Sequence, residues 1–242
     1  MATYKEIVGQ KITKVTSDPS EPKTGQMWYN STTGTLRGMG VVSAWSSAAP
    51  LSTARYLANG FGSQTAGVYS AGQTPPGTNV ANTEEYNGTG WTTATSFPST
   101  ATSGGSGGTA TAGVVMGGGA PYRSTSFKYD GSSWTATGAL PTAADNISAC
   151  GTGTQTNIIA AIGRTPSSGN AGTNTEEYDG SAWTNAGALN VASSFPSGFG
   201  TQTLTVAQVK TPNYGGSEQY NGSTWSALPN TGLTAPDRDW ET

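Results

Sequence analysis

The sequence Tyr86-Asn87-Gly88-Thr89-Gly90-Trp91 decides the fold, because the same phrase occurs three more times in the chain. The copies share the pattern Tyr-(Asn/Asp)-Gly-X-X-Trp and run from Tyr129 to Trp134, from Tyr178 to Trp183 and from Tyr220 to Trp225. Their tryptophans recur at intervals of roughly 45 residues, and a fixed period of this length is typical of repeat architectures. Each copy therefore marks one structural unit.

Every copy contains Asn-Gly or Asp-Gly, which is a strong short-range signal of a β-hairpin. In a type I′ turn both central residues need a positive φ, which Gly accepts freely and Asn or Asp tolerates. We expect the Tyr and the Trp of each copy to lie on adjacent antiparallel strands, where their rings pack as a cross-strand pair.

A second common element, a Gly-containing turn followed by an apolar run, precedes each phrase. The turns are Gly62 to Thr65, Gly108 to Thr111, Gly153 to Thr156 and Gly200 to Thr203. Each unit is then predicted to contain a strand, a turn, a buried strand, a loop, a strand, an Asx-Gly turn and a strand. Four strands in a repeat of this length are typical of a propeller blade. In the fourth unit Val209-Lys210 replaces the glycines that end the other apolar runs, so a less regular second strand is expected there.

An apolar strand that ends on Gly117-Gly118-Gly119 and is followed by Tyr129 and Trp134 resembles the kelch motif. The resemblance covers about residues 51–230 and implies an all-β, kelch-like β-propeller over residues 41–242, with four to five four-stranded blades. A segment from Thr35 to Trp45 resembles the last half of a fifth unit, which Leu233 to Thr242 could complete. A four-bladed ring, or an open one, is the alternative.

Composition and charge narrow the function. Of the 242 residues only 10% are charged and 33% are hydrophobic, and the net charge is −3. The acidic balance argues against a nucleic-acid partner, and no apolar window is long enough for a transmembrane helix. The chain contains no histidine, which removes the usual general base and the histidine metal ligands. We therefore expect no enzymatic activity, no cofactor and no metal site.

Adjacent acidic residues occur at Glu84-Glu85 and Glu176-Glu177, with Glu218-Gln219 at the same repeat position. Neighbouring residues on a strand point to opposite faces, so the two carboxylates of a pair cannot converge on one substrate. A repeated structural role is expected, such as pairing with a neighbouring blade.

Residues 1–40 form a separate N-terminal arm. Apolar residues alternate along it at Ile7, Ile12 and Val15, as in an extended strand, and the stretches around Trp28-Tyr29 and Leu36-Arg37 read as a hairpin. The run from Asp18-Pro19 through Gly25 to Arg37 closely resembles a module of phage tail-fibre and other virion proteins, marine phages in particular.

This resemblance implies a non-enzymatic virion structural protein, assembled in the host cytoplasm, that serves host attachment or decorates the particle. The arm would bind other virion proteins or further copies of the chain through residues that we expect to be Ile7, Ile12, Val15, Trp28 and Tyr29. Alternatively, the arm completes the propeller or packs on its own chain. A separate alternative for the whole protein is a free carbohydrate-binding propeller.

The loop between the second and third strands varies most among the units, and loops on one rim of a repeat protein often bind partners. Its candidate binding residues have stacking rings or hydrogen-bond donors and are Gln73, Tyr122, Arg123, Arg164, Lys210 and Tyr214. Such a rim suits a host-surface glycan or an acidic protein surface. The alternative is that the recurrent Thr-Pro of these loops only starts a turn.

Overall fold

The computed structural model describes residues 12–21, 26–38, 47–119, 121–150, 155–161, 163–166, 171–194, 196–209 and 216–229. These residues contain many strands and no helix, which confirms the expected all-β class. The chain divides into two units, Met1–Ser47 and Ala48–Thr242.

The first unit holds one three-stranded sheet, with strands β1 (Thr13–Val15), β2 (Met27–Asn30) and β3 (Thr35–Gly38) in that order. β1 pairs with β2 in parallel, while β2 and β3 form the expected hairpin. Thr35–Gly38, which the sequence suggested as part of a fifth blade, thus pairs with β2 of the first unit, and the number of blades stays a prediction. The remaining parts of that blade, around Trp45 and Leu233 to Thr242, lie outside the described residues.

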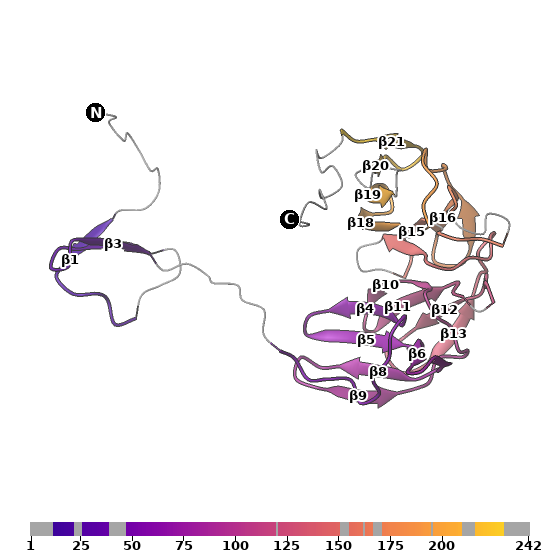
Figure 1. Cartoon of the computed structure of the whole chain (residues 1–242), viewed down its shortest axis with the longest axis horizontal. Coiled ribbons are helices and arrows are strands. Elements are labelled where there is room, and N and C mark those ends of the chain that lie inside the picture. Colours follow the sequence, from indigo (N-terminus) through magenta and orange to yellow (C-terminus); the bar gives the residue numbers. More distant parts are fainter. Residues whose placement is uncertain are drawn as a thin grey trace, which may run out of the picture. The chain divides into compact units, whose positions relative to one another are not determined.

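The second unit contains four four-stranded antiparallel sheets, numbered here in chain order (Figure 1). Sheet 1 consists of β4 (Asn59–Ser63), β5 (Ala66–Ser70), β8 (Thr83–Tyr86) and β9 (Trp91–Ala94). Sheet 2 consists of β10 (Gly105–Thr109), β11 (Ala112–Met116), β12 (Ser126–Tyr129) and β13 (Trp134–Thr137). Sheet 3 consists of β14 (Ser148–Cys150), β15 (Ile158–Ala161), β16 (Thr175–Tyr178) and β17 (Trp183–Asn185). Sheet 4 consists of β18 (Ser197–Thr201), β19 (Leu204–Val209), β20 (Gly216–Tyr220) and β21 (Trp225–Ala227). The order of strands within each unit is the one expected from the repeat.

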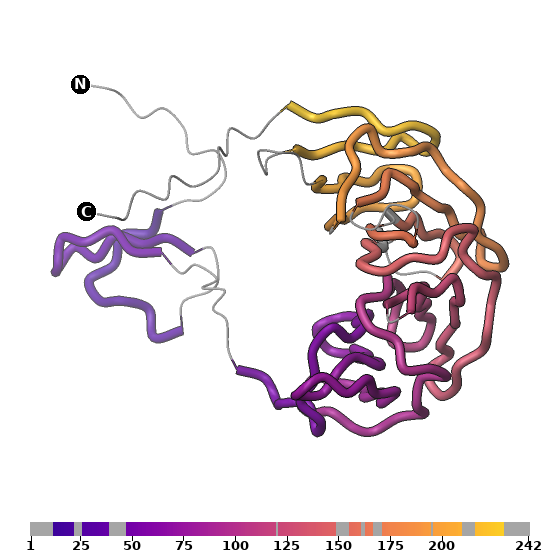
Figure 2. The backbone as a smooth tube through the Cα atoms, turned by 45° about the vertical axis from the view of Figure 1, so that its right-hand side comes forward, coloured from indigo at the N-terminus to yellow at the C-terminus, as the bar shows by residue number. Residues whose placement is uncertain are grey.

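Consecutive sheets pack face to face, and the described sheets follow one another along an arc (Figure 2). Three apolar cores fill the junctions, one between each pair of neighbouring sheets. We call the face that a sheet turns to the following sheet its forward face, and the opposite one its rear face. Val114 and Met116 on the forward face of sheet 2, for example, meet Tyr178 and Trp183 on the rear face of sheet 3.

The repeated phrase forms the turn between the third and fourth strands, and its Tyr and Trp pair across the strands as expected. Ring centroids in the four pairs lie 5.1, 4.6, 4.8 and 5.0 Å apart. The type I′ prediction is wrong, because Tyr86 pairs directly with Trp91 across a four-residue loop and Asn87 does not have a positive φ. Instead, the Asn87 Oδ1 accepts hydrogen bonds from the N–H groups of Thr89 and Gly90. Asn or Asp is needed there as a side-chain acceptor.

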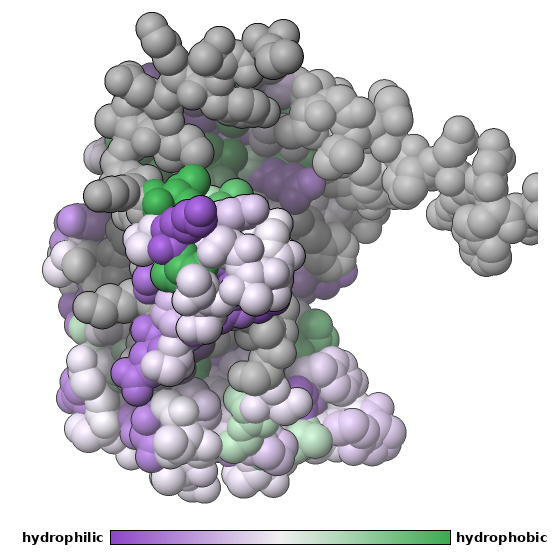
Figure 3. Space-filling view, turned by 90° about the vertical axis from the view of Figure 1, so that its left-hand side faces the viewer, coloured by the Kyte–Doolittle hydropathy of each residue, from purple (hydrophilic) through white to green (hydrophobic). Residues whose placement is uncertain are grey.

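The second strands are the buried ones, as the apolar runs predict; Val68, Val114 and Ile158 are at most 2% exposed. The expectation of an irregular second strand in the fourth sequence repeat, which forms sheet 4, is wrong, because β19 pairs with both of its neighbouring strands over five residues. In addition, β6 (Gln73–Thr74) and β7 (Thr78–Asn79) form a short hairpin in the loop that follows β5. In the space-filling view most described residues are pale, as expected of a surface rich in Gly, Ser and Thr (Figure 3).

Candidate functional site

The candidate binding residues lie at one edge of the sheets, which we call the loop edge. It carries the loops between second and third strands, together with the connections between sheets, while the Gly-containing and Asx-Gly turns lie at the opposite edge. Short backbone bridges link the two kinds of segment, as between Thr102 and Gly119 and between Asp145 and Arg164. The antiparallel topology therefore brings Gln73, Tyr122, Arg123 and Arg164 to one edge. Lys210 and Tyr214 lie outside the described residues.

Gln73 is held within its own loop. Its backbone N–H and C=O bond those of Tyr56, and its side-chain Nε2 donates to Asn79 Oδ1 at 2.7 Å across the β6–β7 hairpin. The side chain is half-buried. These bonds occupy a donor that the sequence had suggested for a partner.

Arg164 forms an ion pair that sequence reasoning missed. Its Nε and Nη2 donate to the two carboxylate oxygens of Asp145 at 2.9 and 2.6 Å, a two-pronged geometry that strengthens such pairs. Asp145 is 5% exposed, and it belongs to the connection between sheets 2 and 3. Hydrogen bonding to Asp145 raises the pKa of Arg164, against a smaller opposing effect of burial. Asp145 thus neutralises much of the Arg164 charge.

Arg123 is half-buried and differs from Arg164 in its partners. Its C=O accepts a hydrogen bond from the Ala144 N–H at 3.0 Å, next to the Asp145 that pairs with Arg164. Its Nε is buried without a hydrogen-bond partner, and its guanidinium forms no ion pair with any residue that the structure describes. Tyr122 is half-buried and close enough to Arg164 to influence the pKa of that guanidinium. The junction of sheets 2 and 3 therefore combines an aromatic ring with a cation that has no ion-pair partner among the described residues, a combination suited to an anionic group on a flat ligand.

A depression of about 290 Å³ also opens at the loop edge, over sheet 3. Its lining is mostly polar and includes Thr142, Asn174 and Asn185. None of the residues that the sequence singled out lines it.

The acidic pairs have the structural role that the sequence predicts, with the two side chains of a pair on opposite faces. Glu84, Glu176 and Glu218 lie on rear faces, are at most 1% exposed and accept hydrogen bonds from the connection that precedes their own sheet. In sheet 4 the carboxylate of Glu218 is fully satisfied, with bonds from the N–H groups of Asn190 and Val191 and from the Asn190 side chain.

Glu176 is less well satisfied. Its Oε1 accepts from the Thr142 N–H at 3.0 Å, but its buried Oε2 has no partner among the described residues. Pro141, which has no N–H, occupies the position from which Asn190 donates to Glu218. Burial raises the pKa of Glu176 to about 7, although the Thr142 hydrogen bond lowers it.

The second acid of each pair points forward and links neighbouring sheets. The hydroxyl groups of Tyr129 and Tyr220 donate to Glu85 and Glu177 of the preceding sheets, at 2.7 and 2.8 Å. Burial, helped by Glu177, raises the pKa of Tyr220 to about 12. In sheet 2 this position is Lys128, whose ammonium donates to the Gly180 C=O of sheet 3 and lies 5.8 Å from the Tyr178 ring centroid.

The first unit is organised around Asp18. Its carboxylate accepts from Trp28 Nε1 at 2.8 Å, from Asn30 Nδ2 at 3.0 Å and from Arg37 Nη1 at 2.5 Å. The hydrogen bonds from Trp28 and Asn30 lower the pKa of Asp18, and Arg37 adds to this effect. Asn30 Oδ1 in turn accepts from the N–H groups that follow it in the hairpin turn. Four residues of the virion-like run thus form a single hydrogen-bonded cluster.

The residues expected to attach this unit fall into two groups. Trp28 is 6% exposed and faces Asp18, so its side chain is engaged within the unit. Ile12 and Tyr29 are 42% and 38% exposed, and Val15 is half-buried; Ile7 lies outside the described residues. Leu36, which the sequence did not single out, pairs directly with Tyr29 and is 53% exposed. Because directly paired residues of a hairpin lie on the same face of the sheet, the predicted hairpin could have shown that Leu36 shares a face with Tyr29.

Neither a metal-binding group of His, Cys, Asp or Glu side chains nor a helix able to span a membrane occurs among the residues that the structure describes. No protein-family model matches the chain, and no curated protein matches it.

Proposed function

We propose that this chain is a non-enzymatic structural protein of a phage virion. Its N-terminal unit attaches it to other virion proteins, and its four sheets are blades of a kelch-like β-propeller that is displayed for attachment to a host surface or to the particle itself. It would be a tail-fibre, appendage or decoration component, assembled in the host cytoplasm.

The observation that carries this proposal is the Asp18 cluster. The residues that resemble the virion module, Asp18, Trp28, Asn30 and Arg37, are the ones that hydrogen-bond to one another. They do so within a unit separate from the sheets. A small folded module next to a repeat unit suits an anchor joined to a displayed domain, and the exposed Tyr29–Leu36 pair gives the anchor an apolar contact surface.

Immunogold electron microscopy of particles of a phage that encodes the chain tests this function, with antibody raised against residues 48–242. Label at the tail tip or fibres is expected for a receptor-binding component, and label at the neck or capsid for a decoration protein. Particles without label, from lysates in which the protein is detected, would reject the virion assignment.

A free carbohydrate-binding propeller is the second candidate. The observation that favours it is Arg123, which lies beside Tyr122 and forms no ion pair within the part of the chain that the structure describes. A glycan array with the full chain and its Arg123→Ala variant tests this candidate. Binding to acidic glycans that the variant loses supports it. Binding that the variant keeps, or no binding by either protein, argues against a site at Arg123.

A further inference from the structure

Sheet 4 presents a forward face that no described sheet covers. On it Phe199 and Leu204 are 73% and 72% exposed, and Gln208 and Gln219 are also exposed. The equivalent faces of the other sheets are closed. Val68, Val114 and Ile159, at the position of Val206 in sheet 4, are at most 2% exposed, whereas Val206 is half-buried.

The junction of sheets 1 and 2 shows how such a face is covered. Phe61 has the position of Phe199, one residue before the glycine that starts the first turn. Its ring centroid lies 6.4 Å from that of Tyr129 and 6.1 Å from that of Trp134, both on the rear face of sheet 2. Gly113 makes the room, because a Cβ atom there would lie 2.0 Å from the Phe61 ring.

The rear face of sheet 1 has an equivalent site over Gly67, which no residue that the structure describes occupies. Gly67 has the position of Gly113, and a Cβ atom added to it would meet no atom closer than 3.5 Å. Tyr86 and Trp91 flank it as a cross-strand pair, with ring centroids 5.1 Å apart. Tyr86 is half-buried, whereas the equivalent Tyr129, Tyr178 and Tyr220 are at most 3% exposed; these three are covered by a preceding sheet.

Polar groups on the rear face of sheet 1 and on the forward face of sheet 4 also have the positions of groups that hydrogen-bond at the other junctions. The Tyr86 hydroxyl donates to the Gly88 C=O of its own turn, whereas those of Tyr129 and Tyr220 donate to an acid of the preceding sheet. Gln219 of sheet 4 has the position of that acid and is exposed.

A second polar match lies at the first turns of the sheets. Gln155 and Gln202 donate to the Tyr129 and Tyr178 C=O groups of the preceding sheets, at 2.6 and 3.1 Å. Gln64 has the same position in sheet 1 and has no hydrogen-bond partner among the described residues. The Tyr220 C=O of sheet 4 is the equivalent acceptor for it.

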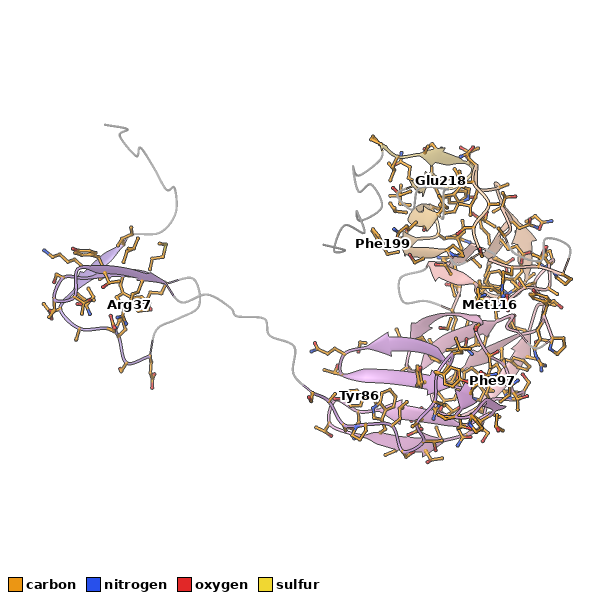
Figure 4. The ribbon with its side chains drawn as sticks, viewed as in Figure 1. Arg37, Tyr86, Phe97, Met116, Phe199 and Glu218 are labelled. Atoms are coloured by element: carbon orange, nitrogen blue, oxygen red, sulfur yellow. The ribbon has the colours of Figure 1, made fainter. Side chains whose placement is uncertain are left out.

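We propose that the forward face of sheet 4 docks on the rear face of sheet 1 in a second copy of this chain, with Phe199 seated over Gly67. Within one chain these two sheets lie at opposite ends of the arc, as Tyr86 and Phe199 show in Figure 4. Because the two faces differ, the contact is head-to-tail and generates a ring or a longer assembly. The inference holds whether or not the chain belongs to a virion.

Two single variants and their mixture test this contact, with the mass of the full chain measured by size-exclusion chromatography and light scattering. Phe199→Glu removes the projecting ring from one face, and Gly67→Leu fills the receptor on the other. Phe199 is largely exposed, and Gly67 has room for a side chain without a positive φ, so both variants should fold as single chains.

The wild type is expected at twice the chain mass of 24.5 kDa or more, and each variant at 24.5 kDa. Mixing the variants should restore a dimer, because Gly67→Leu keeps an intact sheet 4 face and Phe199→Glu keeps an intact sheet 1 face. Circular dichroism checks that each variant is folded, and Phe199→Leu serves as a conservative control that keeps the assembly.

A monomeric wild type would overturn the proposal, as expected if sheets 1 and 4 closed on each other within one chain. An assembly that both variants retain would also overturn it, since the contact would then lie elsewhere, for example in residues 1–47. If each variant is monomeric and their mixture stays monomeric as well, the sheet 4 face does not dock on the sheet 1 face, and the head-to-tail arrangement is wrong.

Discussion

Replacement of Glu176 by Gln should stabilise the protein at neutral and alkaline pH and destabilise it slightly at acidic pH. Glu176 is fully buried, its Oε2 has no partner among the described residues, and burial raises its pKa from 4.5 to about 7. The folded state therefore holds a proton on Glu176 in a pH range in which the unfolded chain has lost it. Stability must then fall as pH rises from about 4.5 to about 7.

The magnitude follows from the same values. At about 1.4 kcal/mol per pKa unit, a rise from 4.5 to about 7 costs the folded state about 3 kcal/mol once pH exceeds 7. Gln keeps an acceptor for the Thr142 N–H but leaves a buried amide N–H₂ without a partner, which costs about 1 kcal/mol. A net gain of about 2 kcal/mol is expected at pH 8, and a net loss of up to about 1 kcal/mol at pH 4.5, where the amide cost remains but the wild-type carboxyl is protonated in the folded state.

Urea unfolding of the wild type and of Glu176→Gln at both pH values measures this difference directly. Glu84→Gln is the matched control, because Glu84 has the same repeat position and pairs with the buried Arg55. Although burial alone raises the pKa of Glu84, bonds from Ser52 and Arg55 lower it below its usual value. Its contribution is therefore present above its usual pKa of 4.5 and is lost as pH falls. Glu84→Gln should destabilise by about 3 kcal/mol at pH 8, since it leaves Arg55 unpaired. Parallel pH profiles for the wild type and Glu176→Gln would refute the argument.

Three further changes have expected outcomes in the same unfolding assay or by NMR. Phe61→Ala should cost about 2–4 kcal/mol by opening a cavity against sheet 2, whereas Phe199→Ala, at low protein concentration, should cost almost nothing; equal losses would show that the two rings are equally buried. Asp130→Ala should destabilise more than Asp130→Asn, because Asn supplies the same turn acceptor in two other copies; equal effects would remove the side chain from the turn. Asp18→Ala in the full chain should shift the Trp28 indole N–H resonance and leave the indole resonances of the sheets unchanged. Acidification of the wild type should shift the same Trp28 resonance, but only below the usual Asp18 pKa of 3.8, because Trp28 and Asn30 lower that pKa. An unmoved Trp28 resonance would contradict the Asp18 cluster.

The repeat made the four sheets predictable, because each hairpin depends on residues that are near one another in sequence. The Tyr–Trp pairs and the buried second strands follow from local pattern alone. The turn type did not follow from the Asn-Gly pair alone. Two further residues, Thr89 and Gly90, lie between Gly88 and Trp91, and their N–H groups donate to the Asn87 side chain. What local pattern cannot supply is the partner of a residue in another sheet.

The candidate site shows the same limit. The loop edge was predictable from the alternation of strands, and four of its expected residues lie there. Whether a cation at that edge is free depends on a distant acid, however, and nothing near Arg164 in the sequence points to Asp145. In the first unit the motif residues, Asp18 included, were recognisable from the sequence. Their hydrogen bonding to one another, with Trp28 and Arg37 both donating to Asp18, was not predictable from it.

Departures from the repeat concentrate at the junctions around sheet 2. Where the connection carries Pro98, sheet 2 has Phe127 at the buried-acid position, and it packs on Phe97 with ring centroids 5.1 Å apart. Where the connection carries Pro141, sheet 3 keeps Glu176, whose Oε2 has no hydrogen-bond partner among the described residues. A proline without an N–H and an acid that needs one are locally inconsistent, and natural proteins keep such conflicts mainly where function requires them. The same connection carries Ala144 and Asp145, which form backbone bridges to Arg123 and Arg164. At the junction of sheets 2 and 3 this conflict therefore lies in the same connection as the partners of Arg123 and Arg164, and we propose this junction as the first place to test for binding.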